Sequence, residues 1–153
     1  MLVLVAPDVD RKQGTLAREL RVESLPALPA HPVRQILMNL RLNAAHAIDV
    51  GGRITLSVIG SAGGLTLRVQ NDGRHIPEEK LQYLFEPFTL ARGQGGGLGL
   101  WVVYQLVNRL RGDIAFDSRP GLTVFAVTLP PAPEGAALMT ERVDERASAA
   151  VLD

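Results

Sequence analysis

The sequence contains no cysteine, carries no net charge and has no hydrophobic run long enough to cross a membrane. Without cysteine it has no disulfide framework, no thiol nucleophile and no thiolate ligand for a metal. Sixteen basic residues balance sixteen acidic ones, so the positive excess of a nucleic-acid-binding protein is missing. The apolar stretches fall well short of the roughly 20 residues of a membrane span. We therefore expect a soluble, cytoplasmic protein without nucleic acid as a partner.

What the sequence does contain is enough apolar material for one core, because 46% of its 153 residues are hydrophobic. Residues 1–6 lack a basic start and are too short for a secretory signal. We expect residues 1–14 to be a lead-in segment, residues 15–130 to form the domain and residues 131–153 to be a flexible tail. The composition shifts to Pro, Ala, Glu and Ser after Pro130, which favours disorder.

Apolar periodicity predicts two long helices. The first begins at Pro32 and extends to about Asp49, and the second covers residues 98–110 and ends in basic residues followed by Gly112. Short helices are expected over residues 7–12, with Gly14 as the stop, and over residues 78–84.

Five strands are predicted, and two strand pairs are joined by short turns. The expected strands are 16–22, 53–59, 65–70, 113–117 and 123–129, and the expected turns are 61–64 and 119–121. Because these two pairs lack an intervening helix, a doubly wound parallel sheet is excluded. The pattern predicts an α/β (α+β) two-layer sandwich, with a mixed, mostly antiparallel sheet of about five strands and helices on one face.

A glycine cluster, Gly93–Gly99, directly precedes the second long helix and contains five glycines in seven residues. Unpaired N–H groups and the helix dipole favour an anion there, and the missing side chains let phosphate approach the backbone. A flexible linker is the alternative, but a linker would be padded with serine rather than continue directly into an apolar helix. The P-loop and dinucleotide motifs are both absent, so a different nucleotide fold is required.

A polar stripe lies beside the apolar one on the first long helix and consists of Gln35, Asn39, Asn43 and His46, spaced three or four residues apart. Asparagine is a mediocre helix former, so two on one helical line need a reason. From this helix alone, a solvated flank explains the stripe as well as a functional face does.

Four segments in order carry a resemblance to a known family. Residues 35–47 resemble its N box, residues 71–77 its first glycine box, residues 85–88 its F box and residues 95–100 its second glycine box. Together, residues 16–130 resemble the ATP-binding catalytic domain of bacterial sensor histidine kinases, in the gyrase, chaperone, kinase and mismatch-repair ATPase superfamily. That family has the Bergerat ATP-binding fold. A single glycine cluster is weak evidence, whereas four boxes in order with this spacing are strong evidence.

The resemblance implies an enzyme module that binds ATP with Mg²⁺ and transfers the γ-phosphoryl group to a histidine on a separate dimerisation domain, with a response regulator downstream. It assigns Asn43 to the metal and Asn39 and Asn43 to catalysis. His46 could reach the terminal phosphate or be an ordinary surface histidine. Residues 86–97 would be the lid over the nucleotide. The resemblance implies an ATP-binding set of Asn39, Asn43, His46, Asn71, Gly73, Ile76, Phe88, Gly95, Gly96, Gly97, Leu98, Gly99, Leu100 and Thr123.

Two positions depart from the family pattern. Asn71 stands where the family usually has aspartate, whose side chain accepts a hydrogen bond from the adenine amino group. A neutral amide makes a weaker hydrogen bond than a carboxylate, so weaker nucleotide binding is expected. His75 stands where the family usually has glycine, and its side chain would crowd the turn or stack near the base. The alternative function is therefore a degenerate nucleotide-binding regulatory module without kinase activity.

Two features of the family and superfamily are missing. Hydrolytic members of the superfamily carry a glutamate where this chain has Asn39, and asparagine cannot accept a proton from water. Slow hydrolysis is therefore expected, which disfavours an autonomous ATPase or chaperone. No histidine resembles the family's phosphoacceptor, because Pro32 follows His31 and the other two histidines lie in the N and first glycine boxes. We expect an isolated, monomeric catalytic domain.

Overall fold

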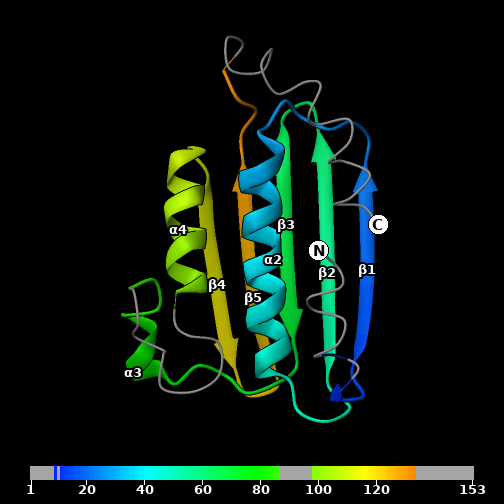
Figure 1. Ribbon diagram of the computed structural model, residues 1–153, viewed down its shortest axis with the longest axis vertical. Helices are drawn as coiled ribbons and strands as arrows, with labels where there is room; N and C mark the ends of the chain where they lie inside the picture. The colour runs from blue at the N-terminus through cyan, green and yellow to red at the C-terminus, as the bar shows by residue number, and fades with distance from the viewer. Residues whose placement is uncertain (1–8, 10, 87–97, 134–153) are drawn as a thin grey trace.

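The computed structural model describes residue 9, residues 11–86 and residues 98–133. The elements in chain order are β1 (Thr15–Val22), α2 (Ala30–Ala47), β2 (Arg53–Ser61), β3 (Gly64–Asn71), α3 (Glu78–Leu81), α4 (Gly99–Arg109), β4 (Asp113–Arg119) and β5 (Leu122–Leu129). Figure 1 shows the strands side by side in one layer, with α2 and α4 in front of them in a second layer. None of the helices in the described ranges is long and apolar enough to cross a membrane.

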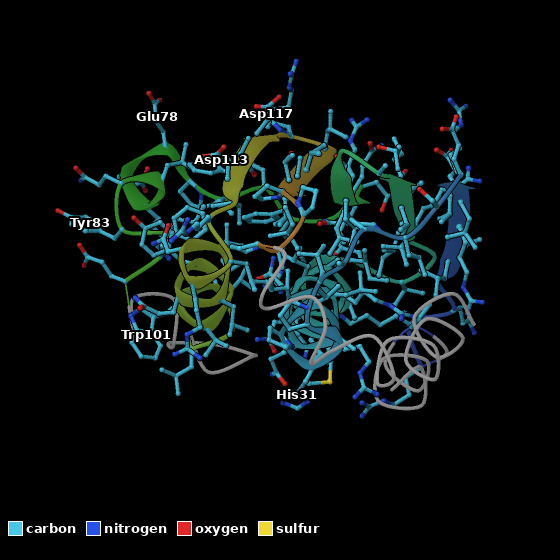
Figure 2. All side chains as sticks on the ribbon, turned by 90° about the horizontal axis from the view of Figure 1, so that it is seen from above. His31, Glu78, Tyr83, Trp101, Asp113 and Asp117 are labelled. Carbon is cyan, nitrogen blue, oxygen red and sulfur yellow. The ribbon has the colours of Figure 1, made fainter. Side chains whose placement is uncertain are left out.

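The sheet has the strand order β1-β2-β3-β5-β4. Strands β1 and β2 are parallel, because α2 connects them and returns the chain to the same edge, whereas all other neighbouring strands are antiparallel. The predicted two-layer sandwich with a mixed, mostly antiparallel five-stranded sheet is therefore confirmed. Viewed from above, His31 and Trp101 lie on the helix side and Asp117 lies on the opposite side of the sheet (Figure 2).

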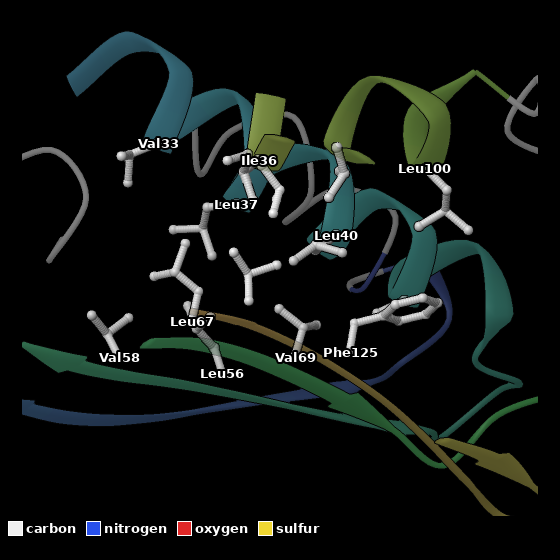
Figure 3. Packing of buried hydrophobic residues seen from close by; sticks show 14 of the residues in the cluster. Val33, Ile36, Leu37, Leu40, Leu56, Val58, Leu67, Val69, Leu100 and Phe125 are labelled. Atoms are coloured by element: carbon white, nitrogen blue, oxygen red, sulfur yellow. The ribbon is translucent and has the colours of Figure 1, made fainter. Parts of the chain in front are cut away.

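The hydrophobic core fills the space between the two layers (Figure 3). One face of α2 supplies apolar side chains at helical spacing, and Leu40 and Ile36 are fully buried. The strands supply alternate residues, which is why β2, β3 and β5 read as apolar at every second position. Core residues facing each other across the layers are Val33, Ile36, Leu37 and Leu40 from α2, Leu100 from α4, and Leu56, Val58, Leu67, Val69 and Phe125 from the sheet.

Two helix ends carry a left-handed residue directly before the glycine that follows the helix. The left-handed residues are Gln13 (φ 52°) and Arg111 (φ 57°), each directly before a glycine. The glycine that follows is needed for space, since a Cβ on Gly112 would lie 2.5 Å from the carbonyl oxygen of Thr128 on β5. Gly14 and Gly112 follow the helix ends, as the sequence predicts, but the residue with left-handed φ is the one directly before each glycine.

Element ends shift by a few residues from their predicted positions. Helix α2 begins at Ala30 rather than Pro32, because proline is tolerated within the first helical turn. Helix α3 ends at Leu81, and the residues up to Glu86 continue in tighter turns, such as the hydrogen bond from Tyr83 N to Lys80 O of 3.1 Å. The predicted domain limits at residues 14 and 131 stay predictions, and most of the predicted tail lies outside the described residues.

Candidate functional site

The polar residues singled out by the sequence gather at one end of the molecule. The C-terminal end of α2, the end of β3 and the start of β5 lie at the lower end in Figure 1, and the first turn of α4 is the lower end of that helix. Helix α2 contacts both α4 in its own layer and β3 in the sheet.

The helix-facing surface of the sheet changes from apolar to polar at this end. One cross-strand row consists of Leu56, Val69, Phe125 and Phe116, and the next row toward the site consists of Ile54, Asn71, Thr123 and Ser118. We call Asn71, Thr123 and Ser118 the polar row. Since strand residues two apart share a face, the polar row continues the core surface. Asn71 and Thr123 are accordingly buried, at 2% and 3% exposure.

Two members of the polar row hold the loop that follows β3. The Ser118 Oγ accepts a hydrogen bond from the Ile76 backbone N–H at 2.8 Å and lies 2.7 Å from the Thr123 Oγ1. This chain of bonds fixes Ile76 against the sheet. Thr123 and Ile76 were both predicted as site residues, whereas Ser118 was missed. The sequence could have indicated Ser118, because it pairs with Thr123 across the short β4–β5 turn.

The third member, Asn71, has an unsatisfied amide nitrogen. Its Nδ2 is buried and has no hydrogen-bond partner within the described part of the chain. A buried donor without an acceptor costs about 1–3 kcal/mol, so such an atom in a folded protein needs an explanation. An acceptor on a bound molecule is one such explanation.

Gly73 brings the loop after β3 onto the end of α2. A Cβ at this position would lie 2.0 Å from the Ala47 carbonyl oxygen, so only glycine fits. The contact lets the Arg74 N–H donate to that same carbonyl at 2.9 Å. The first glycine box and the N box therefore meet through backbone atoms.

Two basic side chains occupy the C-terminal end of α2. Lys12 Nζ donates to the carbonyl oxygens of Ala45 at 2.8 Å, His46 at 3.1 Å and Ile48 at 2.8 Å. The Arg74 guanidinium also donates to the His46 carbonyl, at 2.9 Å. Cations are favoured there because the helix dipole leaves partial negative charge on the last carbonyls. The sequence does not signal the Lys12 contact, since the partners are more than 30 residues apart.

Burial, together with nearby positive charge, favours the neutral form of the His46 imidazole. Its side chain is half-buried, and burial lowers its pKa below 6.5, followed by the positive charges of Lys12 and Arg11. The ring can therefore donate one hydrogen bond but carries no positive charge at pH 7. The same surroundings act on Lys12, where burial and then Arg74 lower the pKa.

The polar stripe on α2 is not a solvated flank. Gln35, Asn39, Asn43 and His46 are all half-buried. The Gln35 Nε2 donates to the Asn39 Oδ1 at 3.4 Å, and the buried Asn39 Nδ2 has no partner within the described residues. Asn39 also lies beside the start of α4, because a Cβ on Gly99 would be 3.9 Å from the Asn39 Cβ.

The first turn of α4 has the features of an anion site. Leu98 is the N-cap residue, no side chain among the described residues caps the turn, and the turn contains no acidic residue. The first backbone N–H groups of a helix have no acceptor inside it, so they point out at the site together with the positive end of the helix dipole. Of the predicted residues here, Leu98 is exposed, Gly99 is half-buried and Leu100 packs into the core. Leu100 can therefore face the site only through its backbone.

Several predicted site residues lie outside the described part of the chain. These are Phe88, Gly95, Gly96 and Gly97, together with all of the predicted lid except Glu86. The described beginning of the F box is anchored, because the Phe85 ring stacks on Tyr104 of α4 with 5.3 Å between centroids. His75 does not crowd its turn, since it is exposed and has no positive φ.

The donor set fits magnesium held mainly by phosphate. Across residues 9, 11–86 and 98–133 there is no cluster of three or more histidine, aspartate or glutamate side chains that could hold a metal alone. Mg²⁺ commonly keeps several waters and binds through one or two protein oxygens plus substrate phosphates. The half-buried Asn43 carboxamide, one turn after Asn39, can supply such an oxygen.

The fold and this site define an ATPase domain of known family. Residues 29–133 match the model of the histidine kinase-, DNA gyrase B- and HSP90-like ATPases, which is more than half of the chain. The chain belongs to this family, as the four boxes predict, and the family implies a site for ATP.

Within this family, the similar proteins are sensor histidine kinases. The chain is 34% identical over 132 residues to the sensor histidine kinase ZraS of Escherichia coli K12, a match covering 84% of this chain and 28% of ZraS. It is 34% identical to the histidine kinase/phosphatase NtrB of Rhodobacter capsulatus, covering 71% of this chain and 36% of NtrB. The chain thus spans about a third or less of these relatives.

The fold agrees with solved catalytic domains. The catalytic domain of histidine kinase ThkA in a nucleotide-free form superposes with a TM-score of 0.75 at 28% identity, over 87% of this chain and 89% of that one. Histidine kinase AdeS of Acinetobacter baumannii gives a TM-score of 0.67 at 25% identity, over 86% of this chain and 61% of that one.

Proposed function

We propose that this chain is the catalytic domain of a two-component sensor histidine kinase, which binds ATP with Mg²⁺ and transfers the γ-phosphoryl group to a histidine on a separate dimerisation domain. The observation that carries the proposal is the buried Asn39 Nδ2, which has no partner among the described residues, beside a first turn of α4 that no described side chain caps. A donor without an acceptor, next to a helix N-terminus, is complementary to a phosphate oxygen.

The nucleotide lies between the two layers in this proposal. Its phosphates face Asn39 and the backbone of Leu98, Gly99 and Leu100, and its base faces Asn71 in the polar row. Gly73 and Ile76 form the wall after β3, fixed by the bonds to Ala47 and Ser118. The proposed site thus has a phosphate end on the helices and a base end on the sheet.

Asn43 is the proposed protein ligand of Mg²⁺, through its carboxamide oxygen. The ion, when bound, neutralises charge on the phosphate oxygens. Asn39 cannot remove a proton from water, so the site binds and orients the nucleotide without a base for hydrolysis. His46, being neutral, can donate a hydrogen bond to the terminal phosphate. The γ-phosphoryl group is therefore transferred to the histidine of the dimerisation domain rather than to water. A response regulator then receives it from that histidine.

The test is Asn43→Ala, assayed for transfer from labelled ATP to an added histidine-containing dimerisation domain of a sensor kinase. We expect transfer and Mg²⁺-dependent ATP binding to be lost, while circular dichroism shows a folded chain, because alanine is the better helix former. The matched control is Asn108→Ala on the exposed face of α4, which should behave as wild type. Wild-type transfer by a folded Asn43→Ala variant would remove Asn43 from the metal site and contradict the proposal.

The second candidate function is a nucleotide-binding regulatory module without kinase activity. Asn71 favours it, because a neutral amide replaces the carboxylate that the family usually has at this position. The same assay separates the two functions. Mg²⁺-dependent ATP binding by the wild-type chain, without transfer to any acceptor domain, would establish the regulatory module.

A further inference from the structure

We infer that the base end of this site accepts 6-oxopurine nucleotides, such as inosine triphosphate, as well as adenine nucleotides, and that Asn71 sets this relaxed choice. The inference rests on the proposed function, since it takes Asn71 as the residue that faces the base. It concerns which base the site binds, whereas the proposed function concerns the phosphates, the metal and the reaction.

The Asn71 side chain has a hydrogen-bond donor that no described residue satisfies. Its side chain is 2% exposed, and its Nδ2 has no partner in the ranges that the structure describes. The polar groups beside it are occupied: Ser118 and Thr123 bond to each other, and Ser118 also binds the Ile76 N–H. The backbone of Asn71 is paired within the sheet, between Ile54 and Thr123. An acceptor on a bound molecule would satisfy the amide nitrogen, which has none among the described residues.

Both kinds of purine can supply that acceptor. The edge of adenine carries an amino donor at position 6 and an acceptor at N1, whereas a 6-oxopurine carries an acceptor at position 6 and a donor at N1. A carboxamide presents one acceptor and one donor side by side. It can therefore pair with adenine in one orientation, and with a 6-oxopurine after a half-turn that exchanges Oδ1 and Nδ2.

A carboxylate cannot make the same exchange. An ionised aspartate only accepts hydrogen bonds, so it suits the adenine amino group and opposes the oxygen of a 6-oxopurine. Asparagine and aspartate have nearly the same shape, and the buried surroundings of position 71 change little between them. Asparagine and aspartate at position 71 are therefore expected to differ mainly in base selectivity. With aspartate, the repulsion between the carboxylate and the oxygen of a 6-oxopurine is the unfavourable contact that rejects that base.

The experiment measures binding of MgATP and of magnesium inosine triphosphate by calorimetry to the wild-type chain and to Asn71→Asp. Inosine triphosphate is the probe because it lacks the 2-amino group through which a carboxylate could bind guanine with two hydrogen bonds. For the wild type, we expect the two dissociation constants to agree within about tenfold. Asn71→Asp should tighten ATP binding and weaken inosine triphosphate binding, widening the ratio by about tenfold or more, as expected for gaining or losing a charge-assisted hydrogen bond.

Asn108→Asp is the matched control, because it makes the same chemical change on the exposed face of α4. It should leave both affinities unchanged, which separates a local effect from an effect of net charge.

The outcomes distinguish the two proposals. If the wild type binds ATP but not inosine triphosphate, the inference is overturned and the proposed function remains. If Asn71→Asp changes both affinities by the same factor, Asn71 does not read the base, and the inference is also overturned. If neither nucleotide binds at millimolar concentration, the proposed function itself fails.

Discussion

Asn39 and Asn71 share an unusual property, which is a buried amide nitrogen without a partner in the described part of the chain. One lies on α2 beside the start of α4, and the other lies in the polar row of the sheet. An apolar side chain would be expected at a buried position without a function, since each unpaired donor costs about 1–3 kcal/mol of folding free energy. A ligand bound as proposed would remove this cost by supplying an acceptor to each nitrogen.

His46 allows a prediction at the same scale. Its pKa is lowered by burial and by nearby Lys12 and Arg11, so the unfolded chain binds a proton more readily than the folded chain below pH 6.5. The stability that the neutral ring provides is complete above pH 6.5 and is lost as the pH falls through the lower folded-state pKa. In His46→Gln this part of the pH dependence should disappear.

Urea denaturation between pH 7.5 and about pH 5 measures the effect, as the slope of the unfolding free energy against pH. His31→Gln is the matched control, because His31 is exposed in the first turn of the same helix and should keep the wild-type slope. Equal slopes in wild type and His46→Gln would contradict the neutral, desolvated state assigned to His46.

The C-terminal end of α2 is the point at which separate elements meet. Lys12, from before β1, and Arg74, from after β3, both donate to its last carbonyls, and Gly73 lies against Ala47. The connection from β3 is therefore held to the helix that carries Asn39 and Asn43. Movement of this end would change the distance between the base end and the phosphate end of the site.

Gly73→Ala tests this junction. The added Cβ would meet backbone atoms of Ala47 and Ile48, which cannot rotate away, so the loop must shift. We expect the unfolding free energy to fall by about 1–3 kcal/mol, as for overpacked sites, and ATP binding to weaken because Ile76 moves with the loop. Chemical denaturation and calorimetry measure the two effects.

Gly63→Ala provides the control for this substitution. Its Cβ would have only the Ser61 hydroxyl nearby, at 3.6 Å, in the β2–β3 turn. Its stability should stay within about 1 kcal/mol of wild type, because an unstrained glycine-to-alanine change mainly reduces the freedom of the unfolded chain. Similar losses in both variants would show that Gly73 is not a special contact.

At the scale of the whole molecule, the site uses both layers. In the proposed function, the phosphate end belongs to α2 and α4 and the base end to the sheet, and the core between the two layers is apolar. A nucleotide bound as proposed therefore connects the layers in the folded state only. Any ligand that binds the folded chain alone raises its stability by mass action.

We expect ATP with Mg²⁺, at about 100 times its dissociation constant, to stabilise the chain by about 2.7 kcal/mol. For a domain of this size the thermal midpoint should rise by roughly 5–15 °C. Differential scanning calorimetry with ATP and Mg²⁺ together, and with each alone, measures the shift. A shift with ATP that is the same without Mg²⁺ would argue against the metal, and no shift would argue against the site.

The sequence by itself determined the layers and the family. Helical spacing on α2, alternation in the strands and short turns between two strand pairs depend only on neighbouring residues, so they could be predicted. Alternation also places Asn71 and Thr123 in phase with the core residues of their strands. The four boxes identify the family because their order and spacing are properties of the chain alone.

The tertiary structure alone decided which of these groups meet and which stay unpaired. The bond from Ile76 to Ser118 depends on the register of β4 and β5, and the Lys12 contact depends on how the lead-in packs on α2. The left-handed residues are Gln13 and Arg111, and a Cβ on the glycine after each would lie within 3 Å of an atom distant in the chain. The burial of a side chain and its hydrogen-bond partners depend on segments distant in the chain. A local sequence pattern therefore cannot predict them.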